Sequence, residues 1–383
     1  MIRISDKHKC TGCTACMAVC PVQCIVMRRD RQGFDYPVGN ADMCIGCGKC
    51  EAVCPVLNPM DAAEPLASYA VRVPEYVEGS SSGGVFPALA KGVIDEGGSV
   101  FGTVLNSDMT VGHAEADDMA GVEAMRGSKY VQSDMYDAFT DVKALLEEGK
   151  NVLFSGTPCQ VAGLNKFLGK IYDNLLTVDV ACHGAPSPGL WEKYVAALGT
   201  RYGGRVTGVK FRDKCRSWRN YEFTVETAEG KFPVPRFNDA YMALFLQDMS
   251  LRPSCYSCPV KSGRSHSDVT LADLWNVSDV AAEMDDDKGV SLVLANSPKG
   301  AAALEAVCEG LVVVDFAEAK KRNAGFSADI KVPERRDEFF AGIHSAKDII
   351  RYMSGFVVRK NVFKKCYECL HTALSRIKRR ITE

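Results

Sequence analysis

Two runs of four closely spaced cysteines near the N-terminus constrain this chain more than any other feature. The runs share the spacing C-x2-C-x2-C-x3-C-P and begin 34 residues apart. Their cysteines are Cys10, Cys13, Cys16, Cys20, Cys44, Cys47, Cys50 and Cys54. A zinc ribbon or a disulfide knot would not produce two copies of a four-cysteine run, each closed by proline. We therefore interpret the repeat as two iron–sulfur sites.

The spacing also predicts which cysteines act together. A 4Fe-4S cube needs four thiolates, and one tight loop supplies only three because it cannot surround a cube. In two-cluster ferredoxins the fourth cysteine of each run serves the other cluster. The predicted ligand sets are Cys10, Cys13, Cys16 and Cys54 for one cluster, and Cys44, Cys47, Cys50 and Cys20 for the other. Cys24 has no role in this scheme, and we expect a buried thiol. Residues 1–60 thus resemble a bacterial-type ferredoxin domain in all eight ligands.

Length and composition limit the remaining possibilities. The chain has 383 residues, which suggests two or three domains, and it has 46% hydrophobic and 25% charged residues, as in globular proteins. A net charge of −2 argues against a nucleic-acid-binding protein. No apolar run is long enough to span a bilayer, and the N-terminus lacks a secretory signal. With 17 cysteines in metal-ligand spacing, we expect a cytoplasmic protein in a reducing compartment.

Residues 68–350 show alternating strand and helix patterns after a proline-containing linker. The predicted strands are 98–105, 151–154, 175–181 and 290–295, and the predicted helices are 85–96, 135–148, 160–168 and 188–198. A β-rich stretch, 205–237, alternates like a hairpin around Glu229–Gly230. The predicted fold class is therefore α+β / α/β: a ferredoxin domain, a mixed α/β domain with an antiparallel addition, and a C-terminal helix.

A third set of cysteines lies in this α/β region. Cys159 and Cys182 each follow a predicted strand, so in a parallel sheet both would lie at the carboxyl edge, where cofactors bind. Cys255-x2-Cys258 lies in a loop that we expect to be neither regular helix nor strand. These four thiols could form a complete tetrathiolate site. The alternative is two separate buried cysteines and a zinc half-site.

Two loops could bind a phosphate-bearing cofactor. Gly79–Gly84 is rich in glycine and serine and leads directly into a predicted helix, whose N-terminus attracts anions. The loop Arg126–Ser133 contains Arg126, Lys129 and Tyr130, which suit a pyrophosphate and a flat ring. A simple helix N-cap and a solvated loop are the respective alternatives.

Several motifs together resemble one family, the coenzyme F420 hydrogenase/dehydrogenase beta-subunit family in its bacterial form with an N-terminal two-cluster ferredoxin domain. The resemblance reaches to about residue 350 and rests on motifs at 81–84, 127–132, 156–160, 182–184, 211–221, 255–258, 267–275 and 289–292. Members hold FAD and a 4Fe-4S cluster in the α/β domain. The resemblance implies that Cys159, Cys182, Cys255 and Cys258 bind a third 4Fe-4S cluster. It places FAD near Ser82, Gly83, Gly84, Ser128, Lys129, Tyr130, Gln132, Thr157 and Gln160.

The resemblance further implies an FAD-dependent oxidoreductase that passes electrons from its clusters through the flavin to a small organic acceptor. Related archaeal proteins reduce a deazaflavin, and a plant and cyanobacterial branch reduces a chlorophyll derivative; nothing in this sequence selects either. The expected partner is an electron donor or acceptor protein, ferredoxin-like or part of a larger redox complex. A non-catalytic relay subunit is the main alternative function, and a scaffold protein with degenerate cofactor loops is a third. No catalytic residue is assigned.

The C-terminal segment, 351–383, carries nine Lys/Arg and two Asp/Glu, a local charge of +7. Apolar residues recur in it at spacings of three and four, which predicts an amphipathic helix. Such a helix could dock on a membrane surface or on an acidic partner. Docking on a membrane would place the protein peripherally at that membrane. The alternative is that it packs on the protein's own acidic body.

Overall fold

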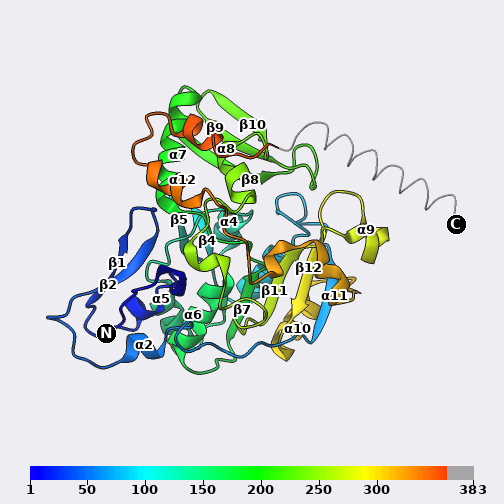
Figure 1. The fold of residues 1–383 in the computed structure, drawn as a ribbon. Coiled ribbons are helices and arrows are strands. Elements are labelled where there is room, and N and C mark those ends of the chain that lie inside the picture. Colours follow the sequence, from blue (N-terminus) through cyan, green and yellow to red (C-terminus); the bar gives the residue numbers. More distant parts are fainter. Residues whose placement is uncertain (360–383) are drawn as a thin grey trace.

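The computed structural model describes residues 1–359, and its architecture is shown in Figure 1. Helix α13 (Ile349–Ser354) is the last described element, so the predicted helix over 351–383 falls largely on residues outside the described ones. None of the described helices is both long and apolar enough to cross a membrane.

The cysteine-rich N-terminal region contains only short elements because its chain turns repeatedly. The elements are η1 (Lys7–Lys9), α1 (Ala15–Ala18), β1 (Ile25–Arg29), β2 (Asp35–Gly39) and α2 (Lys49–Ala52). The repeat seen in the sequence recurs here, since α1 and α2 begin at equivalent places in the two cysteine runs. Their N-caps, Thr14 and Gly48, both have left-handed backbone conformations. Strands β1 and β2 pair antiparallel between the two runs.

A mixed eight-stranded sheet forms the centre of the molecule. Its spatial order is β13 (Val312–Val313), β3 (Ala67–Val71), β12 (Ser291–Ala295), β11 (Val269–Asp273), β7 (Leu175–Val180), β6 (Val152–Gly156), β4 (Ser99–Leu105) and β5 (Val111–Ala116). Strand β4 pairs parallel with β6, β6 with β7, and β7 with β11. The strands outside these four pair antiparallel with their neighbours. The carboxyl ends of β6 and β7 therefore meet at one edge of the sheet, as the sequence predicted.

Helices cover both faces of this sheet because successive strand residues point to opposite sides. On β6, for example, Leu153 belongs to the core under one face and Phe154 to the core under the other. One face is covered by α3 (Val85–Asp95), α4 (Met119–Met125) and α10 (Pro298–Val307); the other is covered by α5 (Ala138–Glu147) and α6 (Pro158–Leu168). Short elements complete the second face: α9 (Val277–Val280), η3 (Ala282–Met284), α11 (Phe316–Ala319), η4 (Lys320–Arg322) and η5 (Ala324–Phe326).

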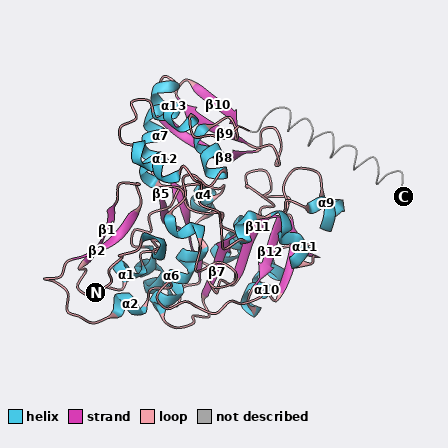
Figure 2. Cartoon of the chain, viewed as in Figure 1, coloured by secondary structure: helices cyan, strands magenta, loops and turns pink. Residues whose placement is uncertain are grey.

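A separate three-stranded antiparallel sheet lies above the central sheet in Figure 2, with helices against it. Its strands are β8 (Val206–Asp213), β9 (Glu222–Thr227) and β10 (Gly230–Pro235). Its helices are α7 (Pro188–Arg201), α8 (Ala240–Leu246), α12 (Arg336–Gly342) and α13. An aromatic core that includes Trp191, Phe211 and Tyr241 joins these layers. The prediction of an antiparallel hairpin was correct, but the hairpin has its own sheet rather than extending the central one.

The predicted fold class is confirmed, with small shifts of element boundaries. The helix predicted over 135–148 begins three residues later, at Ala138, because Met135 begins a turn in which Ala138 N donates to Met135 O over 2.9 Å. The loop that carries Cys255 was expected to lack regular structure, yet it forms the short 3-10 helix η2 (Pro253–Tyr256). Pro253 occupies the first turn of η2, where its missing N–H is not needed.

Candidate functional site

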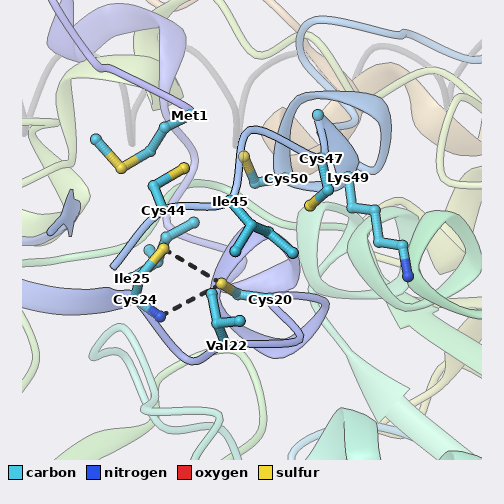
Figure 3. Close-up of a pocket in the computed structure, with 11 residues that line it drawn as sticks. Met1, Cys20, Val22, Cys24, Ile25, Cys44, Ile45, Cys47, Lys49 and Cys50 are labelled. Carbon is cyan, nitrogen blue, oxygen red and sulfur yellow. Dashed lines mark hydrogen bonds between the residues drawn. The ribbon is translucent and has the colours of Figure 1, made fainter. Parts of the chain in front are cut away.

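The first cysteine group lies at the outer end of the N-terminal region and is called the distal group: Cys20, Cys44, Cys47 and Cys50. These residues line one cavity together with apolar side chains, as Figure 3 shows. The cavity is close to solvent, since Cys47 is exposed and only Cys50 of the four is fully buried. The N–H of Ile2 donates a hydrogen bond to Cys50 Sγ over 3.2 Å. Amide-to-sulfur bonds of this kind stabilise a thiolate ligand.

The second group, called the proximal group, comprises Cys10, Cys13, Cys16 and Cys54. These residues line a second cavity, and all four are buried. Burial raises the pKa of Cys13 and of Cys16 to about 12, because an isolated thiolate is poorly stabilised away from water. Binding to iron removes this penalty, since a metal holds a thiol in its deprotonated form. The arrangement of all four thiols around one cavity suits a metal cluster.

The two groups combine the cysteine runs in the crossed manner that the spacing predicted: Cys54 lies with the first run and Cys20 with the second. Gly12, Gly46 and Gly48, which lie between cysteines of the two runs, all have positive φ. Around Gly46 and Gly48 there is open space, whereas a Cβ on Gly12 would come within 2.8 Å of Arg252 Nη1. The identity of the ligands themselves stays a prediction.

Arg252 ties the proximal group to the α/β region. Its side chain is fully buried, and its Nε donates a hydrogen bond to the carbonyl of Cys10 over 2.7 Å. Its Nη2 lies 3.6 Å from Cys10 Sγ and 3.0 Å from the carbonyl oxygen of Asp35. Its Nη1 donates to Gln132 Oε1 over 3.0 Å, and the guanidinium covers the Tyr36 ring at 4.2 Å. One positive charge therefore sits beside a predicted iron ligand.

The third set of thiols comes from three loops at the carboxyl edge of the central sheet. Cys159 is the second residue of α6, Cys182 follows β7, and Cys255 lies in η2. The loop after β7 packs on the loop around η2: Ala185 N donates to Cys255 Sγ over 3.4 Å, and Arg252 N donates to Ala185 O over 2.9 Å. Burial strongly raises the pKa of Cys182, and negative charge on Cys255, Cys159 and Cys258 would raise it further. The loop that carries Cys182 therefore contacts the loop that carries Cys255 and Cys258.

The proximal group and the third set meet across α6. Helix α1, which carries Cys16, packs on α6 and α5. A Cβ on Gly163 would come within 3.0 Å of Cys13 Cβ and 3.1 Å of Cys13 Sγ, so only glycine leaves this space free. Burial is the main cause that raises the pKa of Cys159, and charge on Cys258 and then on Cys13 adds to it. Cys159 lies four residues before Gly163 on α6, so it is on the same side of the helix as the contact with Cys13.

No three Cys, His, Asp or Glu side chains among residues 1–359 converge closely enough to hold a single metal ion. A cubane cluster places different demands on its ligands, because each thiolate binds a different iron corner. Thiols arranged around a cavity suit such a cluster better than thiols that converge on one point.

Most side chains predicted to contact FAD are hydrogen-bonded within the protein. Lys129 Nζ donates to the carbonyls of Ala124, Met125 and Arg126, at 2.8 to 3.0 Å, and so caps the C-terminus of α4. Burial lowers its pKa to about 7. Gln160 closes a capping box with Thr157 at the start of α6, and Gln132 donates to the carbonyl of Thr11 over 3.1 Å.

The glycine- and serine-rich loop meets the loop after α4. Ser128 N and Ser128 Oγ lie 2.8 and 2.9 Å from Ser81 Oγ, which brings both predicted phosphate loops together. Ser82 donates to the carbonyl of Val290, and Gly83 N donates to Ser291 Oγ, so this part of the loop is fixed on β12. Gly84 has a left-handed conformation at the N-cap of α3.

A cationic and aromatic cluster beside these loops was missed as a site from the sequence, although Phe211-Arg212-x-Lys214 was recognised as a motif. The Arg212 side chain is 3% exposed, and its Nη1 pairs with Asp273 over 2.6 Å. Among the described residues, its Nε and Nη2 have no hydrogen-bond partner, nor does Nε of Arg126. The Arg212 guanidinium lies 4.8 Å from the Tyr221 ring centre and 5.1 Å from that of Trp275. Unpaired buried donors of this kind suit an anionic, flat ligand.

Lys214 extends this cluster toward the loops. Its Nζ donates to the carbonyls of Val77 and Lys288. Burial and then the charge of Arg212 lower its pKa to about 8. Tyr130 packs from the other side, stacked on Phe245 with ring centres 4.4 Å apart. Strand alternation alone could not reveal the cluster, because Phe211 and Arg212 are adjacent and both buried.

Comparisons with known proteins agree with the motifs in the sequence. Residues 149–319 match the family model for the C-terminal part of the coenzyme F420 hydrogenase/dehydrogenase beta subunit, and residues 9–58 match the model of a 4Fe-4S dicluster domain. Both matches confirm the resemblance drawn from the sequence. No curated protein matches the chain in sequence.

One solved structure similar to this chain belongs to the F420-reducing [NiFe] hydrogenase complex from Methanosarcina barkeri, studied as a xenon derivative. The TM-score is 0.46 and the sequence identity 17%, over 77% of this chain and 91% of that chain. At these values the similarity is too weak to support a conclusion about this chain.

Proposed function

We propose, for a chain that belongs to the coenzyme F420 hydrogenase/dehydrogenase beta-subunit family and carries a 4Fe-4S dicluster domain, that it passes electrons from its clusters through FAD to an organic acceptor. The observation that carries the proposal is the packing of the proximal group on α6, the helix that carries Cys159, with Gly163 beside Cys13. Electron transfer needs closely spaced centres, and this contact supports a path from the N-terminal region into the α/β region.

The proposed path begins at the distal group, continues through the proximal group and reaches the third set, Cys159, Cys182, Cys255 and Cys258. Iron–sulfur centres carry single electrons, and a bound flavin accepts these one at a time and releases them as a pair. The chain's own residues hold the centres in place. Arg252 and Gln132 join the two regions, and Cys13 packs on α6 at Gly163, four residues after Cys159.

The proposal that FAD binds here rests on hydrogen-bond donors that have no partner within the described chain. Arg212 and Arg126 would hold the pyrophosphate with Ser81 and Ser128, and Tyr130 and Trp275 would contact flat rings. Lys129, Gln132, Thr157 and Gln160 would act mainly by fixing these loops, since their polar atoms already have partners. The assignment of Ser82, Gly83 and Gly84 to FAD stays a prediction.

The test is anaerobic purification followed by iron, sulfide and flavin analysis. We expect about twelve irons and one FAD per chain, because three cubane clusters hold four irons each. Eight irons with full FAD would remove the third cluster. Iron without flavin would favour a non-catalytic relay subunit of a larger redox complex. Zinc bound at Cys255 and Cys258 would contradict the tetrathiolate site.

Cys159→Ala provides a second, independent test of the path. It should leave the proximal and distal groups unchanged but stop their electrons from reaching the flavin. Cys215→Ala is the matched control, because Cys215 is exposed and lines neither the distal nor the proximal cavity. Normal flavin reduction in the Cys159 variant would contradict the proposed order of centres.

A further inference from the structure

The buried cations of the chain divide into two pairs according to their counter-charges. Among residues 1–359, the buried lysine and arginine residues are Arg212, Arg252, Lys261 and Arg336. A charge removed from water needs an opposite charge nearby, because its desolvation is otherwise too costly. Arg212 pairs with Asp273 over 2.6 Å, and Arg336 lies 3.8 Å from Asp337. Within the same described range, Arg252 and Lys261 have no carboxylate partner, and their acceptors are neutral groups or a thiol.

Lys261 lies where the loops of the third set meet. It follows Cys258 by three residues. Its Nζ donates to the carbonyl of His183, the residue next to Cys182, over 3.4 Å. It also donates to the carbonyl of Ser327 over 2.8 Å. Because both acceptors are neutral carbonyls, these hydrogen bonds hold the ammonium in place but leave its charge uncompensated.

The thiols of the third set are within reach of this charge. Burial raises the pKa of Cys182, and the ammonium of Lys261 is the foremost of the charges that act on that thiol, which it favours in the ionised form. It acts in the same direction on Cys255. A cluster held by four thiolates carries negative charge that would compensate Lys261. Lys261 therefore stands beside the third set as Arg252 stands beside Cys10.

We propose that Lys261 is the counter-charge of the third cluster and raises its reduction potential, so that this cluster accepts electrons from the proximal one. The inference rests on the proposed function, since it requires a cluster in the third set. In the transfer, one electron leaves the reduced proximal cluster and enters the oxidised third cluster, while Lys261 keeps its proton. Lys261 acts through the cluster and is a positioning residue.

The same reasoning gives the path a direction. Reduction adds negative charge to a cluster, so a nearby cation favours the reduced form, most strongly where water is excluded. The proximal group has the buried Arg252, and the third set has the buried Lys261. The lysine that lines the distal cavity, Lys49, is exposed, so water and salt screen its charge. The buried cations thus favour electron flow from the distal group inward.

Redox titration of the anaerobically purified full chain, followed by electron paramagnetic resonance, tests the charge at position 261. The signal of the third cluster is the one that is absent from Cys159→Ala. Lys261→Met and Lys261→Gln should both shift the potential of this cluster to more negative values, because they remove the charge. Lys261→Arg should keep it near that of the unmodified protein. The proximal and distal potentials should not change in any variant.

Lys299→Met is the matched control. Lys299 also donates to two backbone carbonyls, those of Tyr172 and Leu175, but its charge is compensated by Asp268 at 3.5 Å. The control therefore loses a comparable set of hydrogen bonds from a lysine that has its own carboxylate. All three cluster potentials should stay constant in it.

An unchanged third potential in both neutral variants, or an equal shift in Lys261→Arg, would overturn the inference. If the neutral variants lose the third cluster, iron analysis decides. Loss of about four irons from Lys261→Met and Lys261→Gln but not from Lys261→Arg supports a need for the charge, and loss from all three variants overturns it. Fewer than three clusters in the unmodified protein would also end the proposed path. Three clusters, with a third potential that ignores residue 261, would refute only the role of Lys261.

Discussion

The two cysteine groups come from one repeated motif, yet the protein places them in opposite environments. All four thiols of the proximal group are buried, and Arg252 and α6 enclose them from the α/β side. In the distal group Cys47 is exposed, and a fifth cysteine, Cys24, also lines the cavity. Identical ligand spacing therefore does not give the two sites the same surroundings.

The difference follows from what each run packs against. The first run contributes Cys13 and Ala15 to the core under α5 and α6, and the β1–β2 turn docks on α7, where Ser187 Oγ donates to Gln32 O over 2.6 Å. The second run contributes only Val53 to that core. Side chains around it, such as Ile45 and Leu57, are more than half exposed. The proximal group suits transfer inside the protein, and the distal group suits exchange with another protein.

The largest expected difference concerns the loss of a proximal ligand. Cys13→Ala should remove about four irons and nearly all flavin reduction by an external protein donor, since Cys13 is a predicted ligand of the cluster that packs on α6, the helix that carries Cys159. Iron analysis and stopped-flow flavin absorbance measure both effects. Cys308→Ala is the control, because Cys308 is a buried cysteine at the end of α10 in a different core. Retained flavin reduction in the Cys13 variant would end the distinction between the two groups.

The second prediction concerns Arg252, which contacts a cysteine of the proximal group but none of the distal group. Arg252→Met should leave the carbonyls of Cys10 and Asp35 and the amide of Gln132 without a donor, at a total cost of about 3 kcal/mol in unfolding free energy. It also removes a positive charge beside Cys10 Sγ. The proximal cluster should therefore become harder to reduce, because reduction adds negative charge.

Redox titration followed by electron paramagnetic resonance measures both potentials in one sample. Only the proximal potential should become more negative, and the distal potential should stay constant. Arg335→Met is the matched control, since Arg335 is exposed and pairs with Glu338. Equal shifts of both potentials would show that the guanidinium does not act locally.

The third prediction concerns oxidative loss of the clusters. Ferricyanide should destroy the distal cluster several times faster than the proximal one, because reagents reach the exposed Cys47 but not the buried Cys13. The decay of the two resonance signals with time measures the two rates. Faster loss of the proximal signal would contradict the burial argument.

Much of this comparison could be predicted from the sequence, because the ligand spacing is a local property. The crossed grouping of Cys20 and Cys54 follows from the size of a cube and the shortness of each loop. The strands over 98–105 and 175–181 were also predictable, since their apolar runs are long and bounded by turns. The third set was suggested by the positions of Cys159 and Cys182 after two strands.

The features that distinguish the two groups are long-range, and for that reason the sequence does not reveal them. Arg252 and Cys10 are 242 positions apart, and no local pattern marks a buried arginine as a partner of a thiol. Arg212 was quoted in a motif, but its unpaired donors depend on Asp273, Tyr221 and Trp275, which come from separate elements. The sequence placed Lys129 near FAD, but its ammonium caps the C-terminus of α4. The contact between Cys24 and Cys20 is local, but it depends on the turn at Gln23, which the spacing of the cysteines does not reveal.

The smallest expected effect tests the contact between α6 and the proximal group. Glycine inside a helix costs up to about 1 kcal/mol relative to alanine, so Gly163→Ala would ordinarily stabilise α6. Here the new methyl group would lie 3.0 Å from Cys13 Cβ and 3.1 Å from Cys13 Sγ. A thiolate bound to iron cannot move away, so strain should outweigh the helix preference and give a net loss of about 1 kcal/mol.

Gly92→Ala in α3 is the matched control, because it gains the same helix preference and meets only a methyl group of Val307 at 3.0 Å. A side-chain methyl group can rotate away, whereas Cys13 is fixed in the proximal group if the ligand assignment is correct. Denaturant unfolding of both variants should therefore give changes of opposite sign, and only Gly163→Ala should alter the proximal resonance signal. Stabilisation in both variants, with unchanged spectra, would mean that Cys13 is free to move and does not bind iron.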